Sequence, residues 1–126
     1  MYNITVSNGE ILDKYTILII KLDKIKSQTK LLNVKNELKV LEPIVKELIN
    51  KYDIEILINK LKDINNKLWN IEDNIREKEK LKEFDQKFID IARSVYYNND
   101  IRAQIKYQIN TITNSELCEE KSYESY

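Results

Sequence analysis

The stretch from Leu57 to Ile75 reads LINKLKDINNKLWNIEDNI. Its large apolar residues recur at alternating steps of four and three, at Leu57, Leu61, Ile64, Leu68, Ile71 and Ile75. This is the heptad spacing of a helix that lies against another helix. At about 1.5 Å per residue the stretch spans about 28 Å, so it needs a helical partner of similar length.

The same spacing fits the segment that follows, with a polar break in its middle. Its apolar positions are Phe88, Ile91, Val95, Ile105, Ile109 and Ile112. The two middle positions of the seam fall on Asn98 and Arg102. We therefore predict helices over residues 53–81 and 85–113 that form a long antiparallel hairpin, and the break marks the place to look for a site.

Two further helices are predicted before this hairpin. Ser7 to Glu10 reads SNGE, a capping box in which Ser7 accepts from the Glu10 amide and the Glu10 carboxylate bonds back. The helix that begins there should end near residues 27–29. A second helix should cover residues 30–52, with a break near residues 41–42 because Pro43 cannot continue the hydrogen-bond ladder.

Composition supports an all-α fold. The chain of 126 residues is 42% hydrophobic and 33% charged, with one Gly and one Pro. So few turn-forming residues argue against a β-sandwich or a β-barrel. We predict an all-α, coiled-coil-like helical bundle built on the long hairpin, with one domain over residues 1–113 and a polar C-terminal tail over residues 114–126.

Charge and residue types exclude several functions. The 21 basic and 21 acidic residues are interspersed, so nucleic-acid binding, which needs a basic face, is not expected. The chain has no His and a single cysteine, Cys118, so no metal site, His-based catalytic triad or internal disulfide is predicted, and one Gly cannot form a phosphate-binding loop. No cofactor is expected. The sequence lacks a signal-peptide pattern and a membrane span, which predicts a cytoplasmic protein.

The first candidate site is the polar break in the last helix. It gathers Arg93, Tyr97, Asn98, Asp100 and Arg102 within three turns. A buried Arg needs a carboxylate or phosphate partner, so this could be a pocket for an anionic ligand. Two structural explanations stay open. The helix could drift so that Tyr97 fills the core instead, or a buried Arg–carboxylate pair could fix the helix register.

The second candidate site lies on the preceding helix. Trp69, Glu72, Asp73 and Arg76 share one face at three- and four-residue spacing. Arg76 could simply pair within its own helix. In an antiparallel hairpin, however, residues 69–76 should lie across from residues 91–100, so the two polar groups would face each other.

A third polar group opens the first helix. Glu10, Asp13 and Lys14 lie within its first two turns. Because Glu10 caps the helix and Lys14, one turn beyond it, could pair with it, no function is required.

Several stretches together resemble a small uncharacterised family, a domain of unknown function of bacteria and large DNA viruses. They are VSNGEILDK at 6–14, LWNIED at 68–73, FD at 84–85, ARSVY at 92–96, NDIRA at 99–103 and EEKSY at 119–123. The resemblance covers nearly the whole chain. It implies no known activity, but it implies that the motif at 119–123 is ordered, and it would suit a viral protein in the host cytoplasm or the virion.

We predict a non-enzymatic module for protein interaction or assembly. The apolar seams exceed what one small domain can cover, which favours a homo-oligomer, most simply a dimer, or a protein partner. The alternative is a bundle that binds a small anionic ligand, or acts on it, through an Arg and carboxylate cluster. Its residues would be Trp69, Glu72, Asp73, Arg76, Arg93, Tyr97, Asn98, Asp100 and Arg102.

Overall fold

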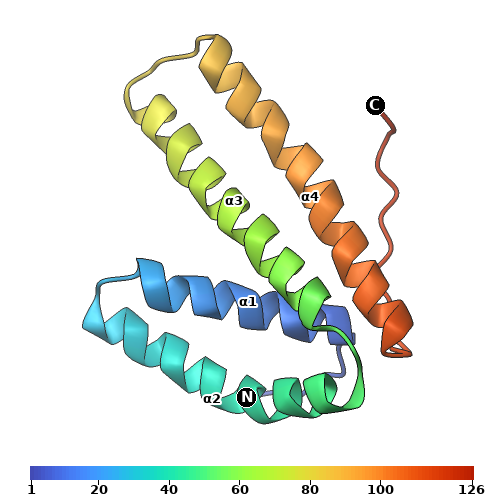
Figure 1. Cartoon of the computed structure of the whole chain (residues 1–126). Coiled ribbons are helices and arrows are strands. Elements are labelled where there is room, and N and C mark those ends of the chain that lie inside the picture. Colours follow the sequence, from blue (N-terminus) through green and yellow to red (C-terminus); the bar gives the residue numbers. More distant parts are fainter.

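The computed structural model describes all 126 residues, as four α-helices with short connections and no strand (Figure 1). The helices are α1 (Asn8–Lys24), α2 (Gln28–Lys51), α3 (Glu55–Lys80) and α4 (Gln86–Ile112). The predicted all-α class is confirmed. None of the helices has both the length and the apolar character that crossing a membrane requires.

The helices form two hairpins that diverge from a common end and give the molecule a V shape (Figure 1). In one hairpin α1 packs on α2, and in the other α3 packs on α4. Helix α1 joins the two hairpins because it contacts both α3 and α4 near the closed end of the V. The ends of α3 and α4 that are joined by the loop at residues 81–85 extend beyond this contact.

The predicted break in the second helix is wrong. Helix α2 runs without interruption from Gln28 to Lys51, with Pro43 inside it. Pro43 lies on the exposed side, as does Lys39, whose carbonyl Pro43 leaves without a helical donor, so water can bond that carbonyl. Leu38 and Val45, on either side of the proline, are both buried, and their packing holds the two halves of the helix in line.

The buried residues all fall within 7–65 and 105–113, in the α1–α2 hairpin and where that hairpin meets α3 and α4. The main core holds Leu12, Val45, Leu48, Ile54, Ile58, Leu61, Ile64, Ile105 and Ile109, and a smaller cluster holds Leu18, Val34 and Leu38. No residue from 66 to 104 is buried. We call residues 66–104 the arm, and residues 7–65 with 105–113 the base.

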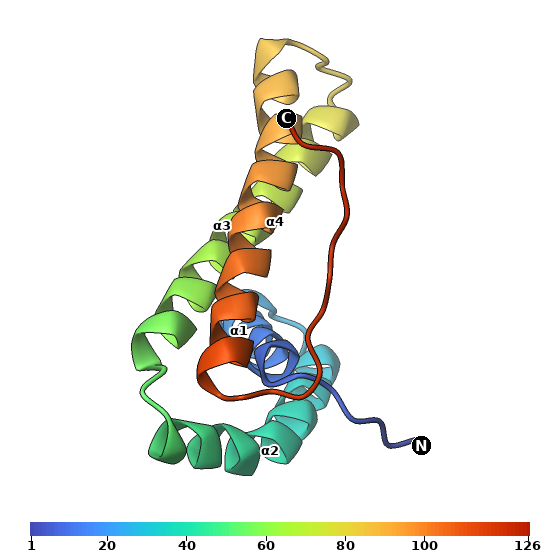
Figure 2. The ribbon, with the colours of Figure 1, turned by 90° about the vertical axis from the view of Figure 1, so that its right-hand side faces the viewer.

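The tail, residues 114–126, contains no helix or strand and returns alongside α4 (Figure 2). Asn114 turns the chain with a left-handed φ of 53°, a conformation that Asn tolerates well. The Ser115 amide then donates to the Asn110 carbonyl at 2.9 Å. No backbone–backbone hydrogen bond involves residues 116–126, so side chains alone attach the rest of the tail to α4.

Candidate functional site

A buried ion pair joins the base to the arm. The Asp13 carboxylate of α1 is almost fully buried, with its side chain 2% exposed. Arg102 of α4 donates to it twice, from Nε to Oδ1 at 2.9 Å and from Nη2 to Oδ2. Two donors aimed at two carboxylate oxygens form a charge-assisted, bidentate pair, which is the strong type of hydrogen bond.

Helix α3 completes the coordination of this carboxylate. The Asn65 amide nitrogen donates to Asp13 Oδ1 at 2.9 Å and contacts Thr16 Oγ1 at 3.0 Å. The Thr16 hydroxyl in turn donates to the Asp13 carbonyl at 2.9 Å. No buried side-chain nitrogen or oxygen in the structure lacks a hydrogen-bond partner. The complete pairing offsets the cost of burying a charge there.

Lys106 adds a second cation one turn along α4. Its side chain is 11% exposed, and Nζ lies 2.8 Å from Glu10 Oε2, 2.9 Å from Glu119 Oε2 and 3.9 Å from Asp13 Oδ2. Glu119 also contacts Lys121 Nζ, through Oε1 at 3.2 Å. We call Glu10, Asp13, Asn65, Arg102, Lys106, Glu119 and Lys121 the polar centre.

The pKa shifts in the polar centre all favour the charged forms. The hydrogen bond to Asp13 raises the pKa of Arg102, although burial opposes this. Burial also opposes the charge on Lys106, but its hydrogen bonds to Glu10 and Glu119 outweigh the burial and raise its pKa. The hydrogen bond from Lys106 lowers the pKa of Glu119. The three groups therefore carry full charges at neutral pH.

Close packing of the start of α1 against the end of α4 sets this geometry. The Gly9 amide donates to Asn110 Oδ1 at 2.6 Å, and a Cβ on Gly9 would lie 2.7 Å from the Lys106 carbonyl oxygen. The Asn8 side chain donates to Thr113 Oγ1 at 2.9 Å. Only a glycine permits this approach, which brings Glu10 and Asp13 to the α4 cations.

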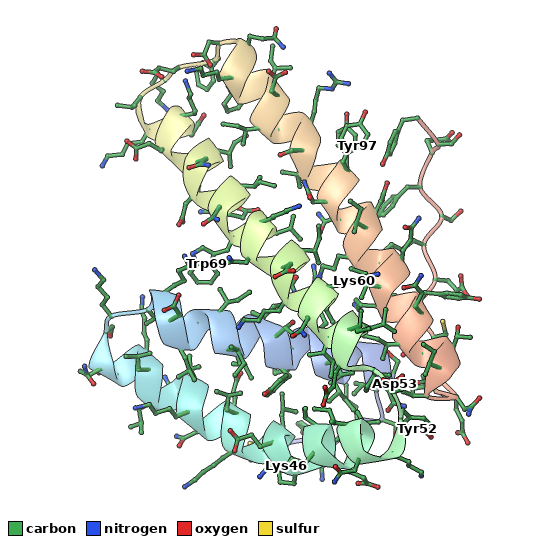
Figure 3. All side chains as sticks on the ribbon, in the orientation of Figure 1. Lys46, Tyr52, Asp53, Lys60, Trp69 and Tyr97 are labelled. Atoms are coloured by element: carbon green, nitrogen blue, oxygen red, sulfur yellow. The ribbon has the colours of Figure 1, made fainter.

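Beside the polar centre, a groove of about 510 Å³ lies between α3 and α4, on the α1 side of the hairpin. It holds five of the nine residues predicted for the site, namely Trp69, Glu72, Asp73, Arg76 and Arg102. Figure 3 shows Trp69 on the side of α3 that faces the opening of the V. The groove also contains Val95 and Asn99 of α4, so the second candidate group does face α4 in the hairpin.

The cations of the groove are engaged within the chain. Arg76 Nε contacts Glu72 Oε2 of its own helix at 3.2 Å, and both side chains are largely exposed. This is the intrahelical pair that the spacing allowed. Arg102 is held by Asp13, which corresponds to the predicted alternative of a buried Arg–carboxylate pair.

The other four predicted residues lie away from the groove. Asn98 donates to the Ser94 carbonyl of its own helix at 2.7 Å, and Arg93 Nε reaches only the Tyr96 hydroxyl, at 3.5 Å. Tyr97 does not fill the core, because it is 41% exposed and points toward the tail (Figure 3).

Asp100 and the aromatic residues attach the end of the tail. Tyr96 and Tyr97 make edge-to-face contacts with Tyr126, with ring centroids 5.1 and 4.8 Å away. The Tyr126 hydroxyl donates to Asp100 Oδ2, and this hydrogen bond raises the pKa of Tyr126 to about 12. These residues therefore act together as a tail contact.

Sequence reasoning missed most of the polar centre. The Ser7 cap is confirmed, since Ser7 Oγ accepts from the Glu10 amide at 3.2 Å. The Glu10–Lys14 pair that the spacing allowed does not form, because Glu10 binds Lys106 while Lys14 lies 3.8 Å from Glu37. The available signal was Asp13 itself, next to Leu12 on a strongly apolar helix. A carboxylate there was the natural partner for the buried Arg that the broken seam implied.

The fold and site together define an all-α protein with a buried Asp–Arg pair between two helical hairpins. No group of three or more His, Cys, Asp or Glu side chains is placed to hold a metal ion. The chain matches a family of unknown function, DUF6165, over residues 2–126, and it belongs to that family. Comparison with curated proteins and with solved structures found no significant match.

Proposed function

We propose that the protein is a non-enzymatic assembly module that forms a homodimer through its arm. The observation that carries this proposal is the absence of any buried residue from 66 to 104. The seam residues of the arm, such as Leu68, Ile75 and Val95, are only half-buried. Two helices alone cannot enclose an apolar seam, which is why isolated helical hairpins gain little stability from packing.

The large solvent-exposed area of the chain also supports the presence of a binding partner. The chain exposes 9372 Å², whereas a compact monomer of this mass exposes about 7,100 Å². The excess is roughly a third of the compact value. A dimer of standard size buries about 800 Å² on each partner, so the arm has enough free surface for one.

A second copy of the chain is the occupant that the charges favour. The arm carries as many basic as acidic side chains, so it offers no net attraction for a strongly charged partner and no net repulsion toward its own copy. Pairing two arms would give a four-helix arrangement with the heptad seams inside. The single free cysteine, Cys118, fits a reducing cytoplasm.

The test is the mass in solution over a range of protein concentrations, measured by sedimentation velocity. Wild-type protein should be a dimer, and Ala92→Lys should be a monomer at the same concentration. Ala92 is half-buried on α4 of the arm and lines a cavity between α4 and the tail, so Lys adds a charge there without removing a core contact. Val40→Lys, at a 69% exposed position of α2, is the matched control and should remain dimeric. A monomeric wild type, or equal dissociation of both variants, contradicts the proposal.

The anionic-ligand alternative at the groove has weaker support. Its two arginines, Arg76 and Arg102, already have carboxylate partners within the chain. A ligand would have to displace Glu72 or compete with the bidentate Asp13 pair.

A further inference from the structure

The polar centre holds three cations and three carboxylates, and the tail contributes one of each, Lys121 and Glu119. Its cations are Arg102, Lys106 and Lys121, and its carboxylates are Glu10, Asp13 and Glu119. Without Glu119 one positive charge is left over, next to a lysine whose side chain is 11% exposed. Lys106 would keep Glu10 at 2.8 Å but lose its second counter-ion, and a small anion at the position of the Glu119 carboxylate would restore the charge balance.

Glu119 is the member of this set that can leave most easily. Glu10 and Asp13 are fixed by α1, whereas Glu119 belongs to the tail, where no backbone–backbone hydrogen bond holds the chain. Its side chain is 44% exposed. Rotation of this one side chain toward solvent would free Lys106 and Lys121 without moving the rest of the tail.

Space for a ligand exists beside the Glu119 carboxylate. A cavity of about 270 Å³ is lined by polar groups that include Asn99, Arg102, Lys106 and Lys121. Each carboxylate oxygen of Glu119 contacts a different lysine, Oε2 at 2.9 Å from Lys106 Nζ and Oε1 at 3.2 Å from Lys121 Nζ. Two oxygens of another carboxylate or of a phosphate group can make the same two contacts.

We propose that Lys106 and Lys121, beside Arg102, form a binding site for a small carboxylate or phosphate, and that Glu119 is the internal anion that fills it in the absence of ligand. The site lies apart from the apolar seams of the arm, so it does not depend on the proposed dimer. An internal competitor lowers the apparent affinity for the ligand by the fraction of time that it occupies the site.

The experiment removes the competitor and measures anion binding. Inorganic phosphate and, separately, acetate are titrated into full-length protein by calorimetry, in chloride buffer at constant ionic strength. Glu119→Gln should bind one of these anions about tenfold more tightly than wild type. Glu120→Gln is the matched control, because it removes the same charge from the adjacent residue, for which no ion pair is found, and it should bind as wild type does. Binding of one anion and not the other supports the site and assigns its chemistry.

A second substitution separates a specific site from a general charge effect. Lys121→Gln in the Glu119→Gln background should cancel the gain in affinity. Lys121 is 37% exposed, so its loss does not threaten the core. The proposal is overturned if Glu119→Gln binds neither anion more tightly than Glu120→Gln, or if the gain persists without Lys121.

Discussion

Helices α3 and α4 run through both the base and the arm, yet only the base has a core. In α3 the heptad residue Leu61 is fully buried, while Leu68, two turns further along the same seam, is half-exposed. The sequence pattern does not change between them. The difference is α1, which packs on α3 and α4 in the base and meets the arm at Arg102, where the arm joins the base. Burial of a heptad seam therefore depends on a third element.

The largest effect is expected where charge is buried in the base. Asp13→Asn leaves Arg102 and Lys106 without their buried carboxylate and should lower the free energy of unfolding by about 3–5 kcal/mol. Glu72→Gln in the arm breaks an exposed ion pair and should cost less than about 0.5 kcal/mol. Urea denaturation of both variants measures the difference. Similar losses would show that the buried pair is no more important than the exposed one.

Truncation of the seam compares base and arm directly. Leu61→Ala should destabilise by about 3 kcal/mol, within the usual range for a fully buried leucine, and Leu68→Ala by about 1 kcal/mol. Thermal unfolding at micromolar concentration gives both values. If the arm pairs with a second copy, the Leu68→Ala penalty should grow with protein concentration, whereas the Leu61→Ala penalty should stay constant. A constant Leu68→Ala penalty would count against an interface on the arm.

A smaller effect is expected where α1 meets α4. Gly9→Ala places a methyl group 2.7 Å from the backbone oxygen of Lys106, which cannot move aside as a side chain could. We expect a loss of about 1–3 kcal/mol from this overpacking. Replacing a helical glycine by alanine normally stabilises by about 0.5–1 kcal/mol. A lower urea midpoint for Gly9→Ala would therefore support the predicted overpacking, and a higher midpoint would contradict it.

The smallest effect should appear as a pH dependence. The hydrogen bond from Lys106 lowers the pKa of Glu119 below its ordinary value of 4.5, so the folded protein binds this proton less readily than the unfolded chain does. The stability from this contact is therefore present above pH 4.5 and is lost as the pH falls through the lowered pKa. Urea midpoints measured on the acid side should fall less steeply for Glu119→Gln than for wild type. Parallel curves would exclude this contribution.

Helix positions could be read from the sequence because apolar spacing and Ser caps are local signals. Ser7 and Asp85 both cap helices through their side chains, as N-terminal Ser and Asp are expected to do. The prediction of a helix break at Pro43 was wrong because the energetic cost of a proline inside a helix depends on whether the freed carbonyl can reach water. The sequence alone does not specify this. The polar centre was harder still, since Asp13 lies 89 residues from Arg102 along the chain, and several carboxylates were equally available as partners.

That separation has a consequence for how the chain folds. The two hairpins are made of contacts between sequence neighbours, which form early because short loops close at low entropic cost. The Asp13–Arg102 pair joins residues that are 89 positions apart in the chain, so we expect it to form after both hairpins. We expect Asp13 substitutions to change mainly the unfolding rate, as for contacts that are absent from the folding transition state. The polar centre would then determine the kinetic stability of the protein, that is, the lifetime of the folded state before it unfolds.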